Sequence, residues 1–129
     1  MSDDVKEASR TFEKRLSVRF MVPGASVSWK PNGRDSFSES DIPLADISRG
    51  GLAFLSNNPP TVGSSLFIKL FLPLGKETLE LLGRVIYSIP HNPGVIYRHR
   101  VGVRVMALLD TNPNVIRAYE DKYAKPKKD

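Results

Sequence analysis

The amino-acid sequence predicts a mainly β domain, in which six antiparallel strands close into a barrel and one α-helix follows at the C-terminal end. Three observations predict this fold. Turn signals rich in Pro, Gly and Asn recur at short intervals, the segments between them have strand character, and helical spacing is confined to the end of the chain. Hairpin-length connections favour antiparallel pairing, and closure into a barrel removes the exposed edges of the sheet. The length of 129 residues suits one domain with a single core.

The six strands are expected, in order, at 25–29, 41–48, 51–56, 65–74, 78–89 and 100–108. In the first strand apolar residues alternate with serines, and the turn at 31–33 follows. Only an Arg-Gly-Gly turn separates the second strand from the third, and the fourth is apolar on both faces. One face of the fifth strand is expected to carry Leu79, Leu81, Val85, Tyr87 and Ile89. The sixth strand alternates Val101, Val103 and Val105 with Gly102, Arg104 and Met106.

The C-terminal helix is expected at about 112–125. Asn112 occupies the position of an N-cap and Pro113 that of the first helical residue, while the apolar face carries Ile116, Tyr119 and Tyr123 at helical spacing. Residues 1–12 have little apolar surface, which predicts a flexible N-terminal arm. The folded domain is therefore expected over 13–125, with its barrel at roughly 20–110, followed by a basic tail at 126–129.

The composition indicates a cytoplasmic protein. The chain has no cysteine, which suits a reducing compartment, and its polar first residues do not have the pattern of a signal peptide. The longest apolar stretch contains Lys69 and Pro73 and is shorter than the ~20 residues of a membrane span. A formal net charge of +5 favours anionic partners in general.

Catalytic chemistry is not expected. His91 lies in a Pro- and Gly-containing turn and His99 lies between two arginines, and neither has an acid or a nucleophile at a recognisable spacing. Two histidines without cysteine or a carboxylate cluster make a weak metal site, and no phosphate-binding loop is present. We therefore expect a binding protein with no catalytic residue, no metal and no cofactor.

The stretch DISRGGLAF, residues 46–54, carries the first candidate binding residues. If the preceding residues form a regular strand, Leu44, Asp46 and Ser48 share one face and Ile47 lies on the other. A carboxylate and a hydroxyl side by side can accept hydrogen bonds from the donor edge of a planar base, and Gly51 would let a ligand approach the backbone. The alternative is a structural turn with a side-chain-to-backbone contact, and this motif taken alone favours that alternative.

A pair of arginines precedes the first strand. Arg15 and Arg19 are four residues apart, so they share a face in a helix and also in an extended chain. Each guanidinium offers a planar fork of donors that matches phosphate oxygens or the O6/N7 edge of guanine. Arg100 and Arg104 repeat this spacing inside a strand, so the spacing alone carries no information. Arg100 is expected to matter little for binding.

The two motifs in this order, on a six-stranded barrel closed by a helix, resemble the PilZ domain family of bacterial cyclic di-GMP receptors. The resemblance extends from about residue 13 to residue 123, and the segments GRVIY and VGVRV resemble the later strands of the family. Arg15 and Arg19 match the family's Arg-x-x-x-Arg motif. The second motif, (Asp/Asn)-x-Ser-x-x-Gly, is matched by Asp46, Ser48 and Gly51.

The resemblance implies a role for each motif residue. The two arginines would clamp phosphate and the Hoogsteen edge of guanine, the Asp-x-Ser pair would take its donor edge, and the glycine would leave room for the ligand. The residue before the arginine pair, Lys14, is basic, which in this family implies contact with a second, stacked ligand molecule. Two molecules of cyclic di-GMP per protein are therefore expected.

The resemblance also implies a mode of action. Ligand would order the arm at 10–20 over the barrel and change the surface that an unidentified downstream protein contacts. Two alternatives stay open at this point. One is a PilZ-like adaptor that binds protein only, and the other is a basic barrel that binds single-stranded nucleic acid. The latter needs exposed aromatic residues, whereas Trp29 is expected in the core.

Overall fold

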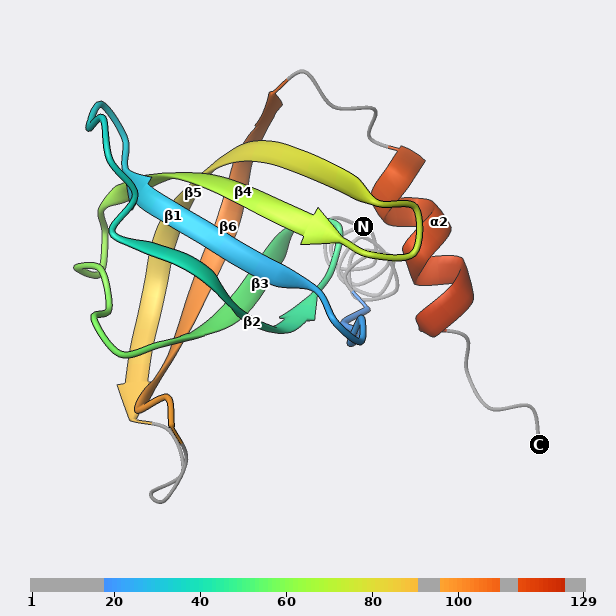
Figure 1. Cartoon of the computed structure of the whole chain (residues 1–129), viewed down its shortest axis with the longest axis horizontal. Coiled ribbons are helices and arrows are strands. Elements are labelled where there is room, and N and C mark those ends of the chain that lie inside the picture. Colours follow the sequence, from blue (N-terminus) through green and yellow to red (C-terminus); the bar gives the residue numbers. More distant parts are fainter. Residues whose placement is uncertain (1–17, 91–95, 110–113, 125–129) are drawn as a thin grey trace, which may run out of the picture.

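The computed structural model describes residues 18–90, 96–109 and 114–124. Within these ranges the chain forms six strands and one helix, which Figure 1 shows as a barrel with the helix beside one end. Their bounds are β1 Ser26–Pro31, β2 Glu39–Ile47, β3 Gly51–Ser56, β4 Ser65–Leu72, β5 Glu77–Pro90, β6 His99–Leu109 and α2 Asn114–Tyr123. Lys14, Arg15 and the whole of the predicted arm at 1–12 lie outside the described residues.

The strands form one closed sheet in the order β1-β2-β3-β6-β5-β4, and all neighbours are antiparallel. Closure comes from β1, which pairs with β2 on one side and with β4 on the other. The predicted mainly β barrel with a C-terminal helix is therefore confirmed. The predicted strand positions agree with the observed bounds to within a few residues at each end, which is the usual uncertainty of strand boundaries.

The core fills the interior of the barrel with the inward-facing residues of every strand. Fully buried aliphatic side chains come from Val27, Leu52, Leu66, Ile68, Leu70, Leu81, Val85 and Val101. Burial of each such side chain stabilises the fold by about 1.5–3 kcal/mol. Trp29 is 3% exposed and stacks on Phe54 with the ring centroids 6.5 Å apart. Its indole N–H donates to a carboxylate oxygen of Glu39 at 2.8 Å, so the buried donor is satisfied.

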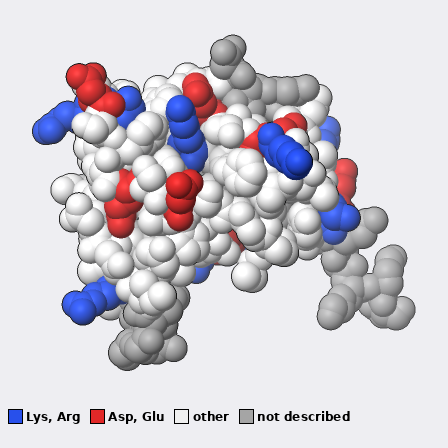
Figure 2. Space-filling view, viewed as in Figure 1, with Lys and Arg blue, Asp and Glu red and all other residues white. Residues whose placement is uncertain are grey.

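Only one face of β4 lies in the core. Its outer face carries Phe67 and Lys69. The ring centroids of Phe67 and Phe37 are 6.1 Å apart, and the Lys30 ammonium lies 5.1 Å from the centroid of the Phe67 ring. Figure 2 shows the face over β1 and β4, where basic and acidic side chains are interspersed and neither sign forms a continuous patch. This face therefore offers no continuous positively charged surface to which a polyanion could bind.

The alternation of β2 is interrupted close to its end. The register of β2 against β3 shifts between Leu44 and Asp46, which marks a β-bulge. As a result Leu44 and Ile47 both point into the core, where they are 9% and 1% exposed, and Asp46 points outward. The expectation that Leu44, Asp46 and Ser48 share one face, opposite Ile47, is therefore wrong.

A bulge also changes the last third of β5, after Val85. Its register against β6 shifts between Val85 and Tyr87, so the core face ends at Val85. Ile86 and Ile89 are 51% and 47% exposed, and Tyr87 lies on the outer surface of the barrel. The expectation that Tyr87 and Ile89 continue the core face of this strand is wrong for the same reason.

Helix α2 packs on the barrel through Ile116 and Tyr119, which are 3% and 4% exposed. The Tyr119 hydroxyl accepts a hydrogen bond from the Gly75 N–H at 2.8 Å and donates to the Leu72 carbonyl at 3.3 Å, which fixes α2 to the turn between β4 and β5. The expected N-cap and first helical residue lie outside the described residues. None of the helices in the described part of the chain is long and apolar enough to cross a membrane.

Candidate functional site

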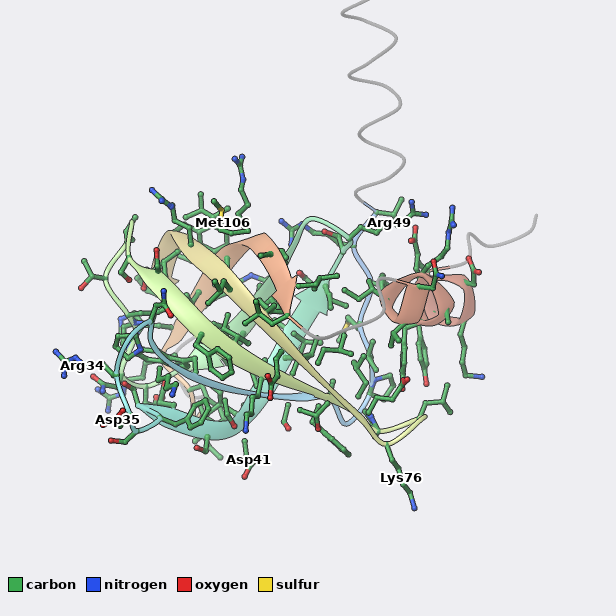
Figure 3. All side chains as sticks on the ribbon, turned by 90° about the horizontal axis from the view of Figure 1, so that it is seen from above. Arg34, Asp35, Asp41, Arg49, Lys76 and Met106 are labelled. Carbon is green, nitrogen blue, oxygen red and sulfur yellow. The ribbon has the colours of Figure 1, made fainter. Side chains whose placement is uncertain are left out.

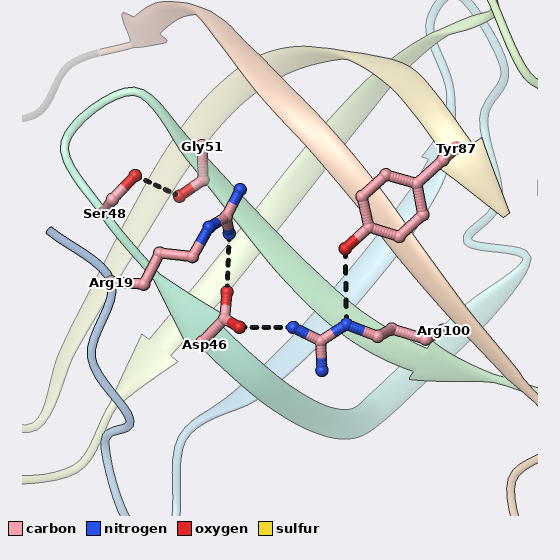
Figure 4. A network of polar contacts seen from close by, with 6 residues as sticks. All are labelled: Arg19, Asp46, Ser48, Gly51, Tyr87 and Arg100. Atoms are coloured by element: carbon pink, nitrogen blue, oxygen red, sulfur yellow. Dashed lines mark hydrogen bonds and ion pairs between the residues drawn. The ribbon is translucent and has the colours of Figure 1, made fainter. Parts of the chain in front are cut away.

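The candidate site is a network of polar side chains centred on Asp46, on the outer surface of the barrel (Figure 4). The bulge in β2 turns this carboxylate outward, and its Oδ1 accepts a hydrogen bond from Arg19 Nη1 at 2.8 Å. Its Oδ2 accepts a second hydrogen bond from Arg100 on β6. Arg100 in turn donates from Nε to the Tyr87 hydroxyl at 3.3 Å. The network therefore joins the start of the described chain to β2, β6 and β5.

Four residues in register form the surface beneath this network. Asp46 pairs with Ala53, Ala53 with Gly102, and Gly102 with Tyr87, so one row crosses β2, β3, β6 and β5. We call this set of four residues the outer row. Its two central members are small, and a Cβ on Gly102 would lie 2.0 Å from the Tyr87 ring, which shows that the ring lies directly over this glycine. The outer row therefore has a carboxylate at one end and an aromatic ring at the other, and its two small central residues are buried.

The three charged groups of the network differ in their access to solvent. The Arg19 side chain is 52% exposed, whereas Arg100 is 29% and Asp46 is 15% exposed. The Tyr87 hydrogen bond raises the pKa of Arg100 above the ordinary value, burial opposes this effect, and contacts with Asp46 add to it. Arg100 is therefore a permanent cation, and two cations share one carboxylate. Such a centre has cationic donors to spare for an anionic ligand.

The chain is anchored immediately after Arg19. Phe20 and Ile47 exchange two backbone hydrogen bonds of 2.9 Å each, and the Phe20 side chain is 4% exposed. Because Ile47 follows Asp46, this bridge holds Arg19 beside the carboxylate. The proximity of the two residues is thus a consequence of backbone pairing as well as of charge.

Ser48 and Gly51 close the turn between β2 and β3 instead of lining an open surface. The Ser48 side chain is 4% exposed, and both its hydroxyl, at 3.4 Å, and its backbone N–H, at 2.8 Å, donate to the Gly51 carbonyl. A Cβ on Gly51 would lie 2.7 Å from the Val103 carbonyl oxygen. Glycine is therefore required here for the close approach of β3 to β6. In the structure, Ser48 and Gly51 therefore form a turn with a side-chain-to-backbone contact, which is the geometry of the structural alternative described above.

The structure thus brings Arg19 and Asp46 together and places the Ser48–Gly51 turn beside them. It also adds Arg100 and Tyr87, which the sequence analysis did not select. Arg100 was expected to matter little for binding, and that expectation stays a prediction, although the structure places its guanidinium in direct contact with Asp46. One sequence feature could have pointed to Arg100, because it lies two residues before the outward-facing Gly102. This feature is informative only when the register of β6 against β3 and β5 is known.

The comparisons with known proteins agree with this geometry. The family model described as "PilZ domain" matches residues 8–121. The chain belongs to the PilZ domain family. PilZ domains are binding or receptor domains rather than enzymes. Within the described residues, no group of three or more His, Cys, Asp or Glu is placed to hold a metal ion.

Among curated proteins, none matches the sequence of this PilZ chain. Among solved structures, the Bacillus subtilis inhibitor of motility MotI/DgrA is similar, with a TM-score of 0.66 and 18% sequence identity. The match covers 84% of this chain and 50% of that chain, so this chain spans about half the length of MotI/DgrA. At this identity the likeness shows a shared fold.

Proposed function

We propose that this PilZ domain is a receptor for cyclic di-GMP, which it binds on the outer row beside Asp46. The observation that carries the proposal is the 2.8 Å contact between Arg19 and Asp46. These residues are 27 positions apart and belong to different motifs of the family, yet their side chains meet on one surface. A ligand with two phosphates and two guanines can use both motifs only if they adjoin in this way.

The chemistry of the network suits such a ligand. A carboxylate has about four lone-pair sites. Arg19 and Arg100 each use one of these sites, so Asp46 keeps acceptors for the donor edge of a guanine. The exposed guanidinium of Arg19 can turn toward a phosphate or toward the O6/N7 edge of guanine. A direct contact between Ser48 and guanine stays a prediction.

Signalling would follow from the position of the arginine pair. Arg15 precedes Arg19 by four residues, so a ligand that contacts both would hold the preceding chain against the barrel. This changes the surface offered to a downstream protein, whose identity is open. The similar solved structure is titled an inhibitor of motility, and control of motility is one output that such a partner could give.

Titration calorimetry with cyclic di-GMP tests the proposal directly. We expect the wild-type chain to bind, and we expect Arg15→Ala, Arg19→Ala and Asp46→Ala each to weaken binding by about 1.5–3 kcal/mol, the value of a charged hydrogen bond. Arg34→Ala is the matched control, because it removes an exposed arginine from the turn between β1 and β2. A wild-type chain that does not bind at saturating ligand contradicts the proposal and favours the adaptor that binds protein only.

The alternative of single-stranded nucleic acid binding has less support. Trp29 is in the core, and the charges of the face over β1 and β4 are mixed in sign. A polyanion needs a positively charged groove with stacking platforms. The same titration with a short oligonucleotide separates this alternative from the receptor.

The number of bound ligands depends, in this proposal, on Lys14. A basic residue at that position can reach the phosphates of a second molecule stacked on the first, and the added positive charge offsets the repulsion between four phosphates. We expect two molecules of cyclic di-GMP per wild-type chain and one per Lys14→Leu chain, measured as the ratio at saturation. A ratio of one ligand per chain in both proteins would contradict this part of the proposal.

A further inference from the structure

A hollow on the outer surface of β5 and β6 lies outside the two motifs of the family. It has a volume of about 320 Å³ and is lined by Arg84, Ile86, Arg104 and Met106. We call it the arginine hollow. Figure 3 shows Met106 pointing away from the barrel. Ile86 and Met106 are 51% and 54% exposed, so the hollow combines two cations with two accessible apolar side chains.

The two arginines of the hollow face each other, and neither has an acidic partner among the residues that the structure describes. Arg84 and Arg104 are directly opposite in the register of β5 and β6. Like charges in directly opposite positions destabilise a sheet. Arg19, Arg49 and Arg100 each contact a carboxylate, whereas no residue in the described part of the chain forms an ion pair with Arg84 or Arg104. An anion bound between the two would relieve this repulsion.

The arginine hollow borders the proposed ligand surface. Arg104 is directly opposite Gly51 of the second motif, and Arg84 follows on the next strand, so the three form a row parallel to the outer row. Gly102 of the outer row precedes Arg104 by two residues on the same face of β6. Neighbouring strands lie about 4.8 Å apart and alternate residues about 7 Å apart. The hollow therefore begins one residue repeat from Gly102 of the outer row, and Arg104 lies two strands away from the strand that carries Asp46.

We propose that the arginine hollow is a second anion-binding subsite, which takes a phosphate group of cyclic di-GMP bound at the outer row or stacked upon it. The inference rests on the proposed function and extends it to residues outside the motifs. Two guanidinium groups present forks of donors that match phosphate oxygens. Ile86 and Met106 offer an apolar surface to the sugar or base beside that phosphate. The volume of the hollow, about 320 Å³, is at the low end of the range of small-molecule sites.

Calorimetric titration of Arg84→Gln and Arg104→Gln with cyclic di-GMP tests this subsite. Glutamine keeps much of the side-chain length but removes the charge, and Arg34→Gln is the control for a loss of net charge elsewhere. We expect each variant of the hollow to bind about tenfold to a hundredfold more weakly, or to hold fewer ligands, while the control binds as the wild type does. A weaker affinity at an unchanged ratio assigns the phosphate to the first molecule, and a lower ratio assigns it to a second.

The outcomes separate this inference from the proposed function. If the wild type binds and both variants of the hollow match it in affinity and ratio, the subsite is wrong and the receptor proposal stands. If the wild type does not bind, both are wrong. Misfolding is checked by thermal melting, and because each substitution removes a like-charge repulsion, we expect neither variant to melt below the wild type.

Discussion

Asp46 is held by two arginines that come from opposite ends of the chain. Arg19 precedes it by 27 residues, and Arg100 follows it by 54. The carboxylate is only 15% exposed, so its loss would leave two neighbouring cations without a counter-charge. Substitution of Asp46 is thus expected to affect the position of Arg19 as well as the direct contact with ligand. A binding defect in that variant reports on both effects together.

Two adjacent glycines in the turn between β2 and β3 allow a test of what the second motif does for the fold. A Cβ on Gly51 would lie 2.7 Å from the Val103 carbonyl oxygen, whereas a Cβ on Gly50 would have nothing within 4 Å. We expect Gly51→Ala to lower the free energy of unfolding by about 1–3 kcal/mol, because backbone must shift. Gly50→Ala should change it by less than about 0.5 kcal/mol. Chemical denaturation measures both, and equal effects would contradict the close approach of β3 to β6.

At the residue scale the sequence predicts the members of the site that belong to spaced motifs. Arg19 and Asp46 were found in this way, and the structure brings them together. Arg100 and Tyr87 could not be found, because their proximity depends on which residues of β5 and β6 pair. A single sequence does not fix that register when one strand contains a bulge.

At the scale of elements, strand positions follow from apolar alternation but the faces of the strands do not. The bulge of β2 against β3 and the bulge of β5 between Val85 and Tyr87 each exchange the inner and outer faces of the strand beyond that point. In β2 this turns Asp46 outward close to the end of the strand, and in β5 it frees Tyr87 to cover Gly102. These two bulges therefore occur where the site is built, whereas further register shifts in the sheet, between Val27 and Trp29 and between Leu82 and Gly83, do not involve its residues.

Two polar side-chain contacts add to the apolar packing of helix α2 on the barrel. Arg49, in the turn that carries the second motif, donates to Glu120 of α2 at 2.8 Å, and Figure 3 shows Arg49 close to this helix. Arg49 is 34% exposed, so this ion pair contributes at most about 1 kcal/mol. The buried Tyr119 provides the other attachment through its hydroxyl group. The motif turn and α2 are thus in direct contact.

The attachment through Tyr119 can be measured with two matched substitutions. Tyr119→Phe removes one hydrogen bond from the Gly75 N–H and one to the Leu72 carbonyl, and we expect the free energy of unfolding to fall by about 1–2 kcal/mol. Tyr123→Phe is the control, since its ring stacks on Tyr119 and the substitution preserves that contact. A control variant as unstable as Tyr119→Phe would show that the loss of stability is not specific to the Tyr119 hydroxyl, and would contradict its role in holding the helix.

At the scale of the whole molecule, the barrel order brings the start of the described chain to the end of β2. The isolated bridge between Phe20 and Ile47 makes this connection, and Val22 follows it into the core at 4% exposure. Closure of the barrel was predictable from six short strands, whereas this bridge lies outside any strand and has no sequence signal. It is the first backbone pairing in the described part of the chain, which begins at residue 18.

The proposed ordering mechanism predicts where hydrogen exchange should change. If ligand bridges the arginine pair and Asp46, amide exchange over residues 14–19 should slow at saturating cyclic di-GMP. Phe20 should change little, because its N–H already donates to the Ile47 carbonyl at 2.9 Å. The Asp46→Ala chain at the same ligand concentration is the control and should show no slowing. Unchanged exchange over 14–19 in a wild-type chain whose binding is confirmed by calorimetry would exclude the ordering mechanism and leave the receptor intact. A signal to a partner would then have to come from the barrel surface, and the contact between Arg49 and α2 would be the first place to look for it.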